Sequence, residues 1–196
     1  MLTFTLAVFL LLITPGPGVL SLAGVGAAFG TKAGTRYFIG LFLGTNLVAL
    51  AVVSGLAAVL FAVPIVRQIL LVASALYLIY LASRIALAGS NIAFMRAKTQ
   101  PGILAGVLLQ TINPKAYAVN TTLFTGFAFL PDALLSETLI KFAIINIIWV
   151  PIHLLWLVAG SSLQRLDLAP KTQFRINLAM AAAMLAVVAL AGFSLI

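Results

Sequence analysis

The chain has 196 residues, of which 64% are hydrophobic and 7% are charged, and its mean hydropathy is +1.25. A soluble domain carries about a quarter charged residues, so this composition excludes an ordinary water-soluble fold and indicates an integral membrane protein. The net charge of +8 fits the enrichment of Lys and Arg in cytoplasmic loops of membrane proteins. The sequence has no basic patch interleaved with polar residues, so nothing in it indicates a nucleic-acid partner.

Long apolar runs, without the alternation of a membrane barrel, predict an all-α membrane protein. A spanning helix needs about 20 mostly apolar residues. Breaks of charge, Pro and Gly therefore predict about six such helices, at residues 2–30, 37–62, 69–88, 103–129, 139–163 and 176–196. We expect a single transmembrane transport domain over residues 1–196, because no linker is long enough to separate soluble domains.

The distribution of basic residues predicts the orientation in the membrane. One side of the predicted bundle has two of them, Arg67 and Lys141. The other side has eight: Lys32, Arg36, Arg84, Arg96, Lys98, Arg165, Lys171 and Arg175. Because basic loops stay in the cytoplasm, both termini are expected outside.

The two halves of the chain share a short motif. Ile13-Thr14-Pro15 in the first helix matches Ile112-Asn113-Pro114 in the fourth, and Pro15 and Pro114 are 99 residues apart. Each half would contain three helices, at about 1–88 and 103–196. An odd number of helices per repeat inverts the second copy, so we expect two inverted three-helix repeats, as in many secondary transporters.

The segment Thr14-Pro15-Gly16-Pro17-Gly18 lies within the first predicted helix. Proline removes a backbone donor and glycine adds flexibility, so the helix is expected to unwind here. Unwound backbone at membrane depth lines a wet cavity or lies buried in protein. The freed carbonyls and the new helix start would suit a substrate ammonium and carboxylate. A packing kink is the alternative.

The segment Asn113-Pro114-Lys115 lies within the fourth predicted helix. A charged side chain near the bilayer centre is costly and marks a functional candidate. Lys115 is expected either to bind a substrate carboxylate or to titrate during transport. The structural alternative is a tether from Lys115 to a carbonyl or to the other broken helix.

Other polar residues lie within the predicted helices, namely Asn46, Gln110, Asn120, Asn146 and His153. Asn46 is assigned to the substrate site with the two broken segments, whereas interhelical hydrogen bonding is the usual role of such amides. The Gly40-x-x-x-Gly44 pair that precedes Asn46 is typical of close helix packing. His153 would act as a proton relay or as a hydrogen-bonded structural residue.

Several chemistries have no support in the sequence. The chain has no cysteine, and its three acidic residues, Asp132, Glu137 and Asp167, lie in or beside the predicted loops. No phosphate-binding loop, metal-ligand cluster or nucleophile–base set is present. We therefore predict neither an enzyme nor a bound metal or cofactor.

The sequence resembles the lysine exporter-type translocators, which include the homoserine and threonine resistance-type amino-acid exporters. The resemblance rests on Pro15-Gly16-Pro17-Gly18-Val19-Leu20, Gly30, Gly34, Gly40, Gly44, Gly55-Leu56, Gly106, Asn113-Pro114-Lys115-Ala116 and Phe129-Leu130-Pro131. The resemblance implies six helices, a bacterial inner-membrane location and proton-driven efflux of amino acids. It also allows a homodimer. Asn46 departs from some relatives, which have an acid early in the second helix.

We therefore expect a secondary active exporter of amino acids or close derivatives. The expected substrate-binding residues are Thr14, Pro15, Gly16, Pro17, Gly18, Asn46, Asn113, Pro114 and Lys115. The alternatives are an exporter of another small solute and a non-transporting membrane scaffold protein. The scaffold alternative predicts no central cavity.

Overall fold

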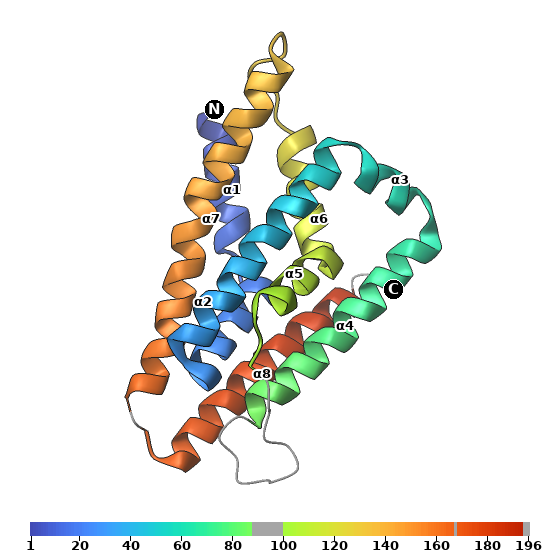
Figure 1. The fold of residues 1–196 in the computed structure, drawn as a ribbon. Coiled ribbons are helices and arrows are strands. Elements are labelled where there is room, and N and C mark those ends of the chain that lie inside the picture. Colours follow the sequence, from blue (N-terminus) through green and yellow to red (C-terminus); the bar gives the residue numbers. More distant parts are fainter. Residues whose placement is uncertain (88–99, 167, 194–196) are drawn as a thin grey trace.

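The computed structural model describes residues 1–87, 100–166 and 168–193, and these ranges form helices without a strand (Figure 1). The predicted connection around Arg96 and Lys98, the acidic Asp167 and the outermost residues of two predicted helices lie outside the described residues. The helices are α1 (Leu2–Ile13), α2 (Pro17–Val53), α3 (Leu56–Ala62), α4 (Pro64–Ala86), α5 (Ile103–Ile112), α6 (Pro114–Thr125), α7 (Leu134–Arg165) and α8 (Pro170–Phe193).

The first predicted helix unwinds where its Pro and Gly residues predicted. α1 ends at Ile13, Gly16 is extended (φ −153°, ψ −178°), and α2 begins with Pro17 in its first turn. Proline suits a first turn because the N–H that it lacks would have no partner there. The result is two shorter helices joined by extended backbone.

The chain reverses at Gly30, inside the residues assigned to α2. Gly30 has a φ of 81° and a ψ of 178°, a conformation that glycine adopts without steric cost. The helical stretches before and after it then pack on each other, since the Tyr37 hydroxyl donates to the Ser21 hydroxyl at 3.1 Å. The predicted loop at residues 31–36 is therefore wrong, because those residues are helical and the turn is made at Gly30.

The fourth predicted helix is also interrupted. α5 ends at Ile112, and Asn113 is extended (φ −79°, ψ 110°) before Pro114 begins α6. The Asn113 side chain accepts a hydrogen bond from the Lys115 backbone N–H at 3.1 Å and so caps α6. The predicted segment 103–129 thus becomes two helices, and the second ends at Thr125.

Other helix boundaries differ from the predicted ones for local reasons. The predicted helix 37–62 is interrupted at Gly55, whose φ is 77°, so that α2 ends and the short α3 follows. Both α4 and α8 begin earlier than expected, with Pro64 and Pro170 as their first residues. The sequence analysis placed these prolines in loops, although proline is favoured in the first turn of a helix.

α2 is the centre of the bundle and packs mainly on α7 and α5, whereas α4 and α8 lie side by side (Figure 1). The predicted close packing at Gly40 and Gly44 is confirmed on α5. A Cβ atom built on Gly40 would lie 2.0 Å from the Ile103 carbonyl oxygen, and one on Gly106 would lie 2.4 Å from the Tyr37 carbonyl oxygen. Only glycine permits this backbone approach.

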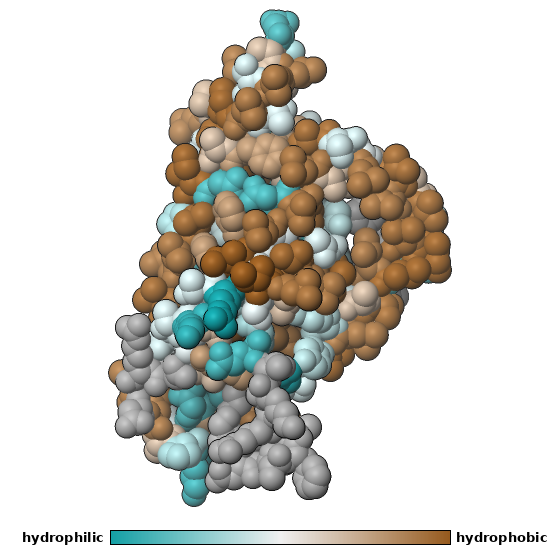
Figure 2. Space-filling view, in the orientation of Figure 1, coloured by the Kyte–Doolittle hydropathy of each residue, from teal (hydrophilic) through white to brown (hydrophobic). Residues whose placement is uncertain are grey.

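The exterior is apolar, as expected for a protein in lipid. Figure 2 shows hydrophobic residues over most of the visible face, including the region of α3 and α4. Large apolar side chains such as Leu76 on α4 and Ile147 on α7 are more than 60% exposed. Within the described residues, α2, α4 and α7 are long and apolar enough to cross a membrane. The chain is therefore a multi-pass helical membrane protein, and six crossings in two inverted repeats stay a prediction.

Candidate functional site

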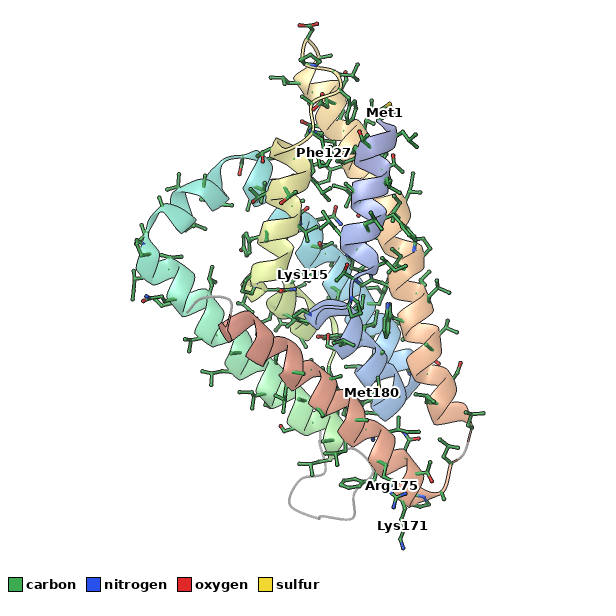
Figure 3. The ribbon with its side chains drawn as sticks, turned by 180° about the vertical axis from the view of Figure 1, so that it is seen from behind. Met1, Lys115, Phe127, Lys171, Arg175 and Met180 are labelled. Carbon is green, nitrogen blue, oxygen red and sulfur yellow. The ribbon has the colours of Figure 1, made fainter. Side chains whose placement is uncertain are left out.

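The two helix breaks lie against each other through Lys115. Its Nζ atom donates to the Thr14 carbonyl oxygen at 2.6 Å and lies 3.5 Å from that of Pro15 (Figure 3). A Cβ atom built on Gly16 would lie 2.8 Å from Cδ of Lys115. The lysine thus occupies the first break, and a tether of the kind named as the structural alternative is present, here to carbonyls that belong to the other break.

Lys115 compensates carbonyls that unwinding leaves without helical partners. The last carbonyls of a helix carry partial negative charge, and α1 ends just before Thr14. An ammonium group has three hydrogens, and Nζ has two carbonyl partners among the described residues, on Thr14 and Pro15. With respect to these residues, one N–H stays available for another acceptor.

The start of α2 adds backbone donors to the same place. Gly18 and Val19 belong to the first turn, where backbone N–H groups have no carbonyl partner within the helix. The N-terminus of a helix also carries partial positive charge. The first break therefore presents carbonyls from α1 and N–H groups from α2 within a few residues of each other.

A pocket lies at this junction. Residues from α1, α2, α5, α6 and α7, together with the breaks, line it: Leu11, Leu12, Thr14, Gly16, Pro17, Gly18, Val19, Thr45, Gln110, Asn113, Lys115, Ala116, Val119, Asn120, Ile145, Trp149 and His153. The sequence analysis selected six of these as substrate-binding, namely Thr14, Gly16, Pro17, Gly18, Asn113 and Lys115. Two others that it selected, Pro15 and Pro114, belong to the breaks without lining the pocket.

Asn46 lies outside the pocket lining, in a different contact. Its side-chain amide exchanges hydrogen bonds with that of Asn146 on α7, at 3.1 and 3.0 Å. Each amide nitrogen also donates to the carbonyl four residues earlier in its own helix, on Phe42 and Phe142. The structure thus gives Asn46 the interhelical role that such amides usually have.

Several polar groups of the pocket were not selected from the sequence as site residues. Gln110 lies one helical turn before Asn113 and accepts from its amide nitrogen at 3.1 Å. This spacing was a usable signal, because residues three apart share a helix face. His153 is 4% exposed, and its ring stacks on Trp149 at 3.5 Å. Only the tertiary packing of α7 shows that these two rings reach the pocket.

An apolar cluster lies between the pocket and the connection from α6 to α7. Its buried members are Phe4, Val8, Leu123 and Ile145. Beside it, Lys141 and Glu137 form an ion pair at 2.7 Å. Lys141 also donates to the carbonyls of Phe124 and Phe127, and Glu137 accepts from the backbone N–H groups of Phe129 and Leu130. The pair therefore holds this connection against α7.

The chemistry of the pocket suits binding of a small solute. Its lining contains an ammonium, amides, two threonine side chains, an indole and an imidazole, and no carboxylate. Among the residues that the structure describes, no group of His, Asp or Glu side chains could hold a metal ion. This lining can recognise a polar solute through hydrogen bonds and one positive charge.

Comparison with known proteins identifies the family. The family model described as LysE type translocator matches residues 9–193, which is nearly the whole chain. No curated protein and no solved structure matches the chain. The chain therefore belongs to the LysE type translocator family, a family of membrane transporters.

Proposed function

We propose that the protein is a secondary active exporter of amino acids or close derivatives across the bacterial inner membrane. The observation that carries this proposal is the pocket at the two helix breaks, with Lys115 bound to Thr14. Membership of a translocator family supports export of a small solute. The chemistry of the pocket supports the choice of amino acids.

A zwitterionic amino acid is complementary to the carbonyl groups and the N–H groups at the first break. Its carboxylate would accept from the free N–H of Lys115 and from backbone N–H groups of Gly18 and Val19. Its ammonium would donate to carbonyls at the end of α1. Pro17 assists this arrangement because it starts α2 without an N–H of its own. In this proposal Pro15 and Pro114 do not contact the solute, and their role is to keep the backbone unwound at the two breaks.

Transport would require the two halves of the molecule to move against each other. Alternating access in inverted-repeat transporters is largely a rocking motion around a fixed site. The pocket lies where the helix break of the first half contacts the helix break of the second half. Lys115 moves with the second half and the Thr14 carbonyl with the first, so their contact would change during the cycle.

The energy source is proposed to be the proton motive force. The titratable side chains that line the pocket are Lys115 and His153. Among the acids, Glu137 is paired with Lys141, and Asp132 is exposed in the connection to α7. A proton carrier at the site is therefore proposed to be Lys115 or His153, in place of the carboxylate of some relatives.

Two alternatives from the sequence analysis stay open to the same test. Another small solute would use the same pocket without needing both a carboxylate and an ammonium. A non-transporting scaffold leaves the polar lining of the pocket without a role. A homodimer stays a prediction, and the proposed binding site is built within one chain.

The test is efflux from cells preloaded with labelled amino acids. We would compare the intact protein, Lys115→Ala and an empty vector, each with and without a protonophore. Lys171→Ala, at an exposed lysine at the start of α8, is the matched control. The proposal predicts faster efflux with the intact protein and the control, and none above the vector with Lys115→Ala or the protonophore.

Equal efflux from vector and intact protein, with confirmed membrane expression and a broad panel, would contradict amino-acid export. Efflux by Lys115→Ala at the rate of the intact protein would instead remove Lys115 from the mechanism. Efflux that the protonophore does not affect would leave export intact and overturn the proposed energy source.

A further inference from the structure

Two side chains that line the pocket each have a nitrogen without a hydrogen-bond partner among the described residues. They belong to Gln110 and His153, each 4% exposed. A Cβ atom built on Gly18 would lie 3.5 Å from Nε2 of Gln110 and 3.7 Å from Nε2 of His153. Within the described part of the chain neither nitrogen has a hydrogen-bond partner, although other atoms of both side chains do.

The hydrogen-bond role of Gln110 is fixed by the backbone. The N–H of Lys115 can only donate, so the Asn113 atom that it contacts is the carbonyl oxygen Oδ1. The amide nitrogen of Asn113 then donates to Gln110, so the contacted atom of Gln110 is Oε1. The free end of Gln110 is consequently its NH₂ group, which is a donor.

The role of His153 is fixed in the same way. Its Nδ1 atom lies 2.9 Å from the Trp149 carbonyl oxygen, which can only accept. In the neutral imidazole Nδ1 therefore carries the hydrogen and Nε2 carries a lone pair. One donor and one acceptor thus each lie within 4 Å of the position that a Cβ atom on Gly18 would take.

From this arrangement we infer that Gln110 and His153 select the substrate side chain, favouring an uncharged hydroxyl or amide and refusing a cationic group. The inference rests on the proposed function and specifies its substrate class. A hydroxyl or carboxamide both donates and accepts, so it satisfies both nitrogens. An apolar side chain leaves both unpaired, and unpaired buried polar groups discriminate strongly against an analogue that lacks the partner.

A cationic side chain meets a different obstacle. An ammonium or guanidinium only donates, so the NH₂ of Gln110 would have no partner. The lining also holds the ammonium of Lys115 and the positive end of α2, and it holds no carboxylate. The substrate's own ammonium already lies among these positive charges, so a cationic side chain would add further repulsion that no carboxylate of the lining offsets.

The spacing of the two groups suits a small amino acid. Lys115 lies against Gly16, and Gln110 and His153 lie against Gly18. The Cα atoms of residues two apart are at most about 7 Å from each other. A carboxylate at Lys115 would therefore place a short side chain beside Gly18.

The test uses the full chain in liposomes preloaded with labelled serine, glutamine, 2-aminobutyrate or lysine. 2-Aminobutyrate replaces the serine hydroxyl by a methyl group. The variants are Gln110→Glu, which adds a carboxylate to the pocket, and Gln100→Glu, which adds the same charge at an exposed position. His153→Phe removes the acceptor and keeps an aromatic ring on Trp149.

We expect the intact protein to export serine and glutamine at least about ten-fold faster than lysine or 2-aminobutyrate. Gln110→Glu should raise the ratio of lysine to serine export about ten-fold, whereas Gln100→Glu should not change it. His153→Phe should bring serine and 2-aminobutyrate to similar rates.

Equal export of lysine and serine by the intact protein would overturn the inference while leaving amino-acid export standing. Equal export of serine and 2-aminobutyrate by the intact protein would also overturn the inference and leave amino-acid export standing. The intact protein alone gives both ratios, so the result does not depend on whether a variant folds. Absence of transport for all four amino acids would instead contradict the proposed function itself.

Discussion

The side-chain amides of Asn46 on α2 and Asn146 on α7 bind each other reciprocally. Each donates to the other, at 3.1 and 3.0 Å, and the two residues are 100 positions apart. Each also donates to the carbonyl of a phenylalanine four residues earlier, Phe42 or Phe142. Each amide thus has one partner in its own helix and one in the facing helix, whereas the two inverted repeats stay a prediction.

The pair should be energetically coupled. Asn46→Ala or Asn146→Ala would each leave the other amide without its interhelical partner and lower the free energy of unfolding by about 1 kcal/mol. The double variant should lose clearly less than the sum, because the second substitution removes no remaining contact between these two side chains. Denaturant unfolding in detergent micelles measures all three.

Ser83→Ala supplies the control for this cycle, because Ser83 on α4 donates only to the nearby Tyr80 carbonyl. Combined with Asn46→Ala, its effect should be additive. Additive losses for Asn46→Ala and Asn146→Ala would show that the reciprocal pair is not a coupled contact.

Gly16→Ala should impair transport more than folding. The added Cβ would lie 2.8 Å from Cδ of Lys115 and 3.1 Å from Nζ, so the flexible lysine must move away from the Thr14 carbonyl. We expect efflux to fall at least about ten-fold with nearly normal expression. Gly102→Ala is the control, since nothing lies within 4 Å of its added Cβ. Normal efflux by Gly16→Ala would mean that the position of Lys115 is not critical.

The ion pair of Glu137 and Lys141 should stabilise the connection between α6 and α7. Glu137→Gln removes the counter-charge of Lys141, whose ammonium otherwise has only carbonyls and the faces of Phe4 and Phe129. Removing one partner of a buried ion pair destabilises a protein more than replacing both partners with uncharged residues. Thermal unfolding in detergent should therefore show a lower midpoint for Glu137→Gln than for Glu137→Gln combined with Lys141→Met.

Asp132→Asn is the matched control for the ion pair, because Asp132 is exposed. It should leave the midpoint unchanged. An unchanged midpoint for Glu137→Gln as well would show that the ion pair does not stabilise this region.

The basic residues predict which ends of the molecule face the cytoplasm. Thr35 lies just after the reversal at Gly30, and Asp132 lies in the connection between α6 and α7, at opposite ends of the bundle (Figure 1). The chain has no cysteine, so single-cysteine variants need no prior substitutions. In intact cells an impermeant thiol reagent should label Asp132→Cys but not Thr35→Cys. The reverse result would invert the predicted orientation.

Local chemistry allowed both helix breaks to be predicted from the sequence. Pro15 and Pro114 each interrupt an apolar run, and the charge of Lys115 marked the second run as unusual. The prolines at the starts of α4 and α8 were misassigned for the opposite reason, because Pro64 and Pro170 begin helices rather than end them.

Tertiary packing decided what the sequence could not. Asn46 and His153 are both polar residues within long apolar helices, and their sequence neighbours do not distinguish an interhelical amide from a pocket residue. The structure pairs Asn46 with Asn146 and places His153 on Trp149 beside Gly18. Which face of α7 meets the breaks depends on the packing of the whole bundle.

The central claim is that a solute binds in the pocket between the two helix breaks. Ala116→Cys places one thiol in the pocket lining of this cysteine-free chain, and Leu76→Cys places one on the exposed apolar face of α4. The measurement is the rate of labelling by a water-soluble thiol reagent, with and without a transported amino acid, in variants that retain efflux. The account predicts labelling of Ala116→Cys that the amino acid slows, and slow, unaffected labelling of Leu76→Cys. Labelling of Ala116→Cys that no transported amino acid changes would contradict the assignment of the pocket as the solute site.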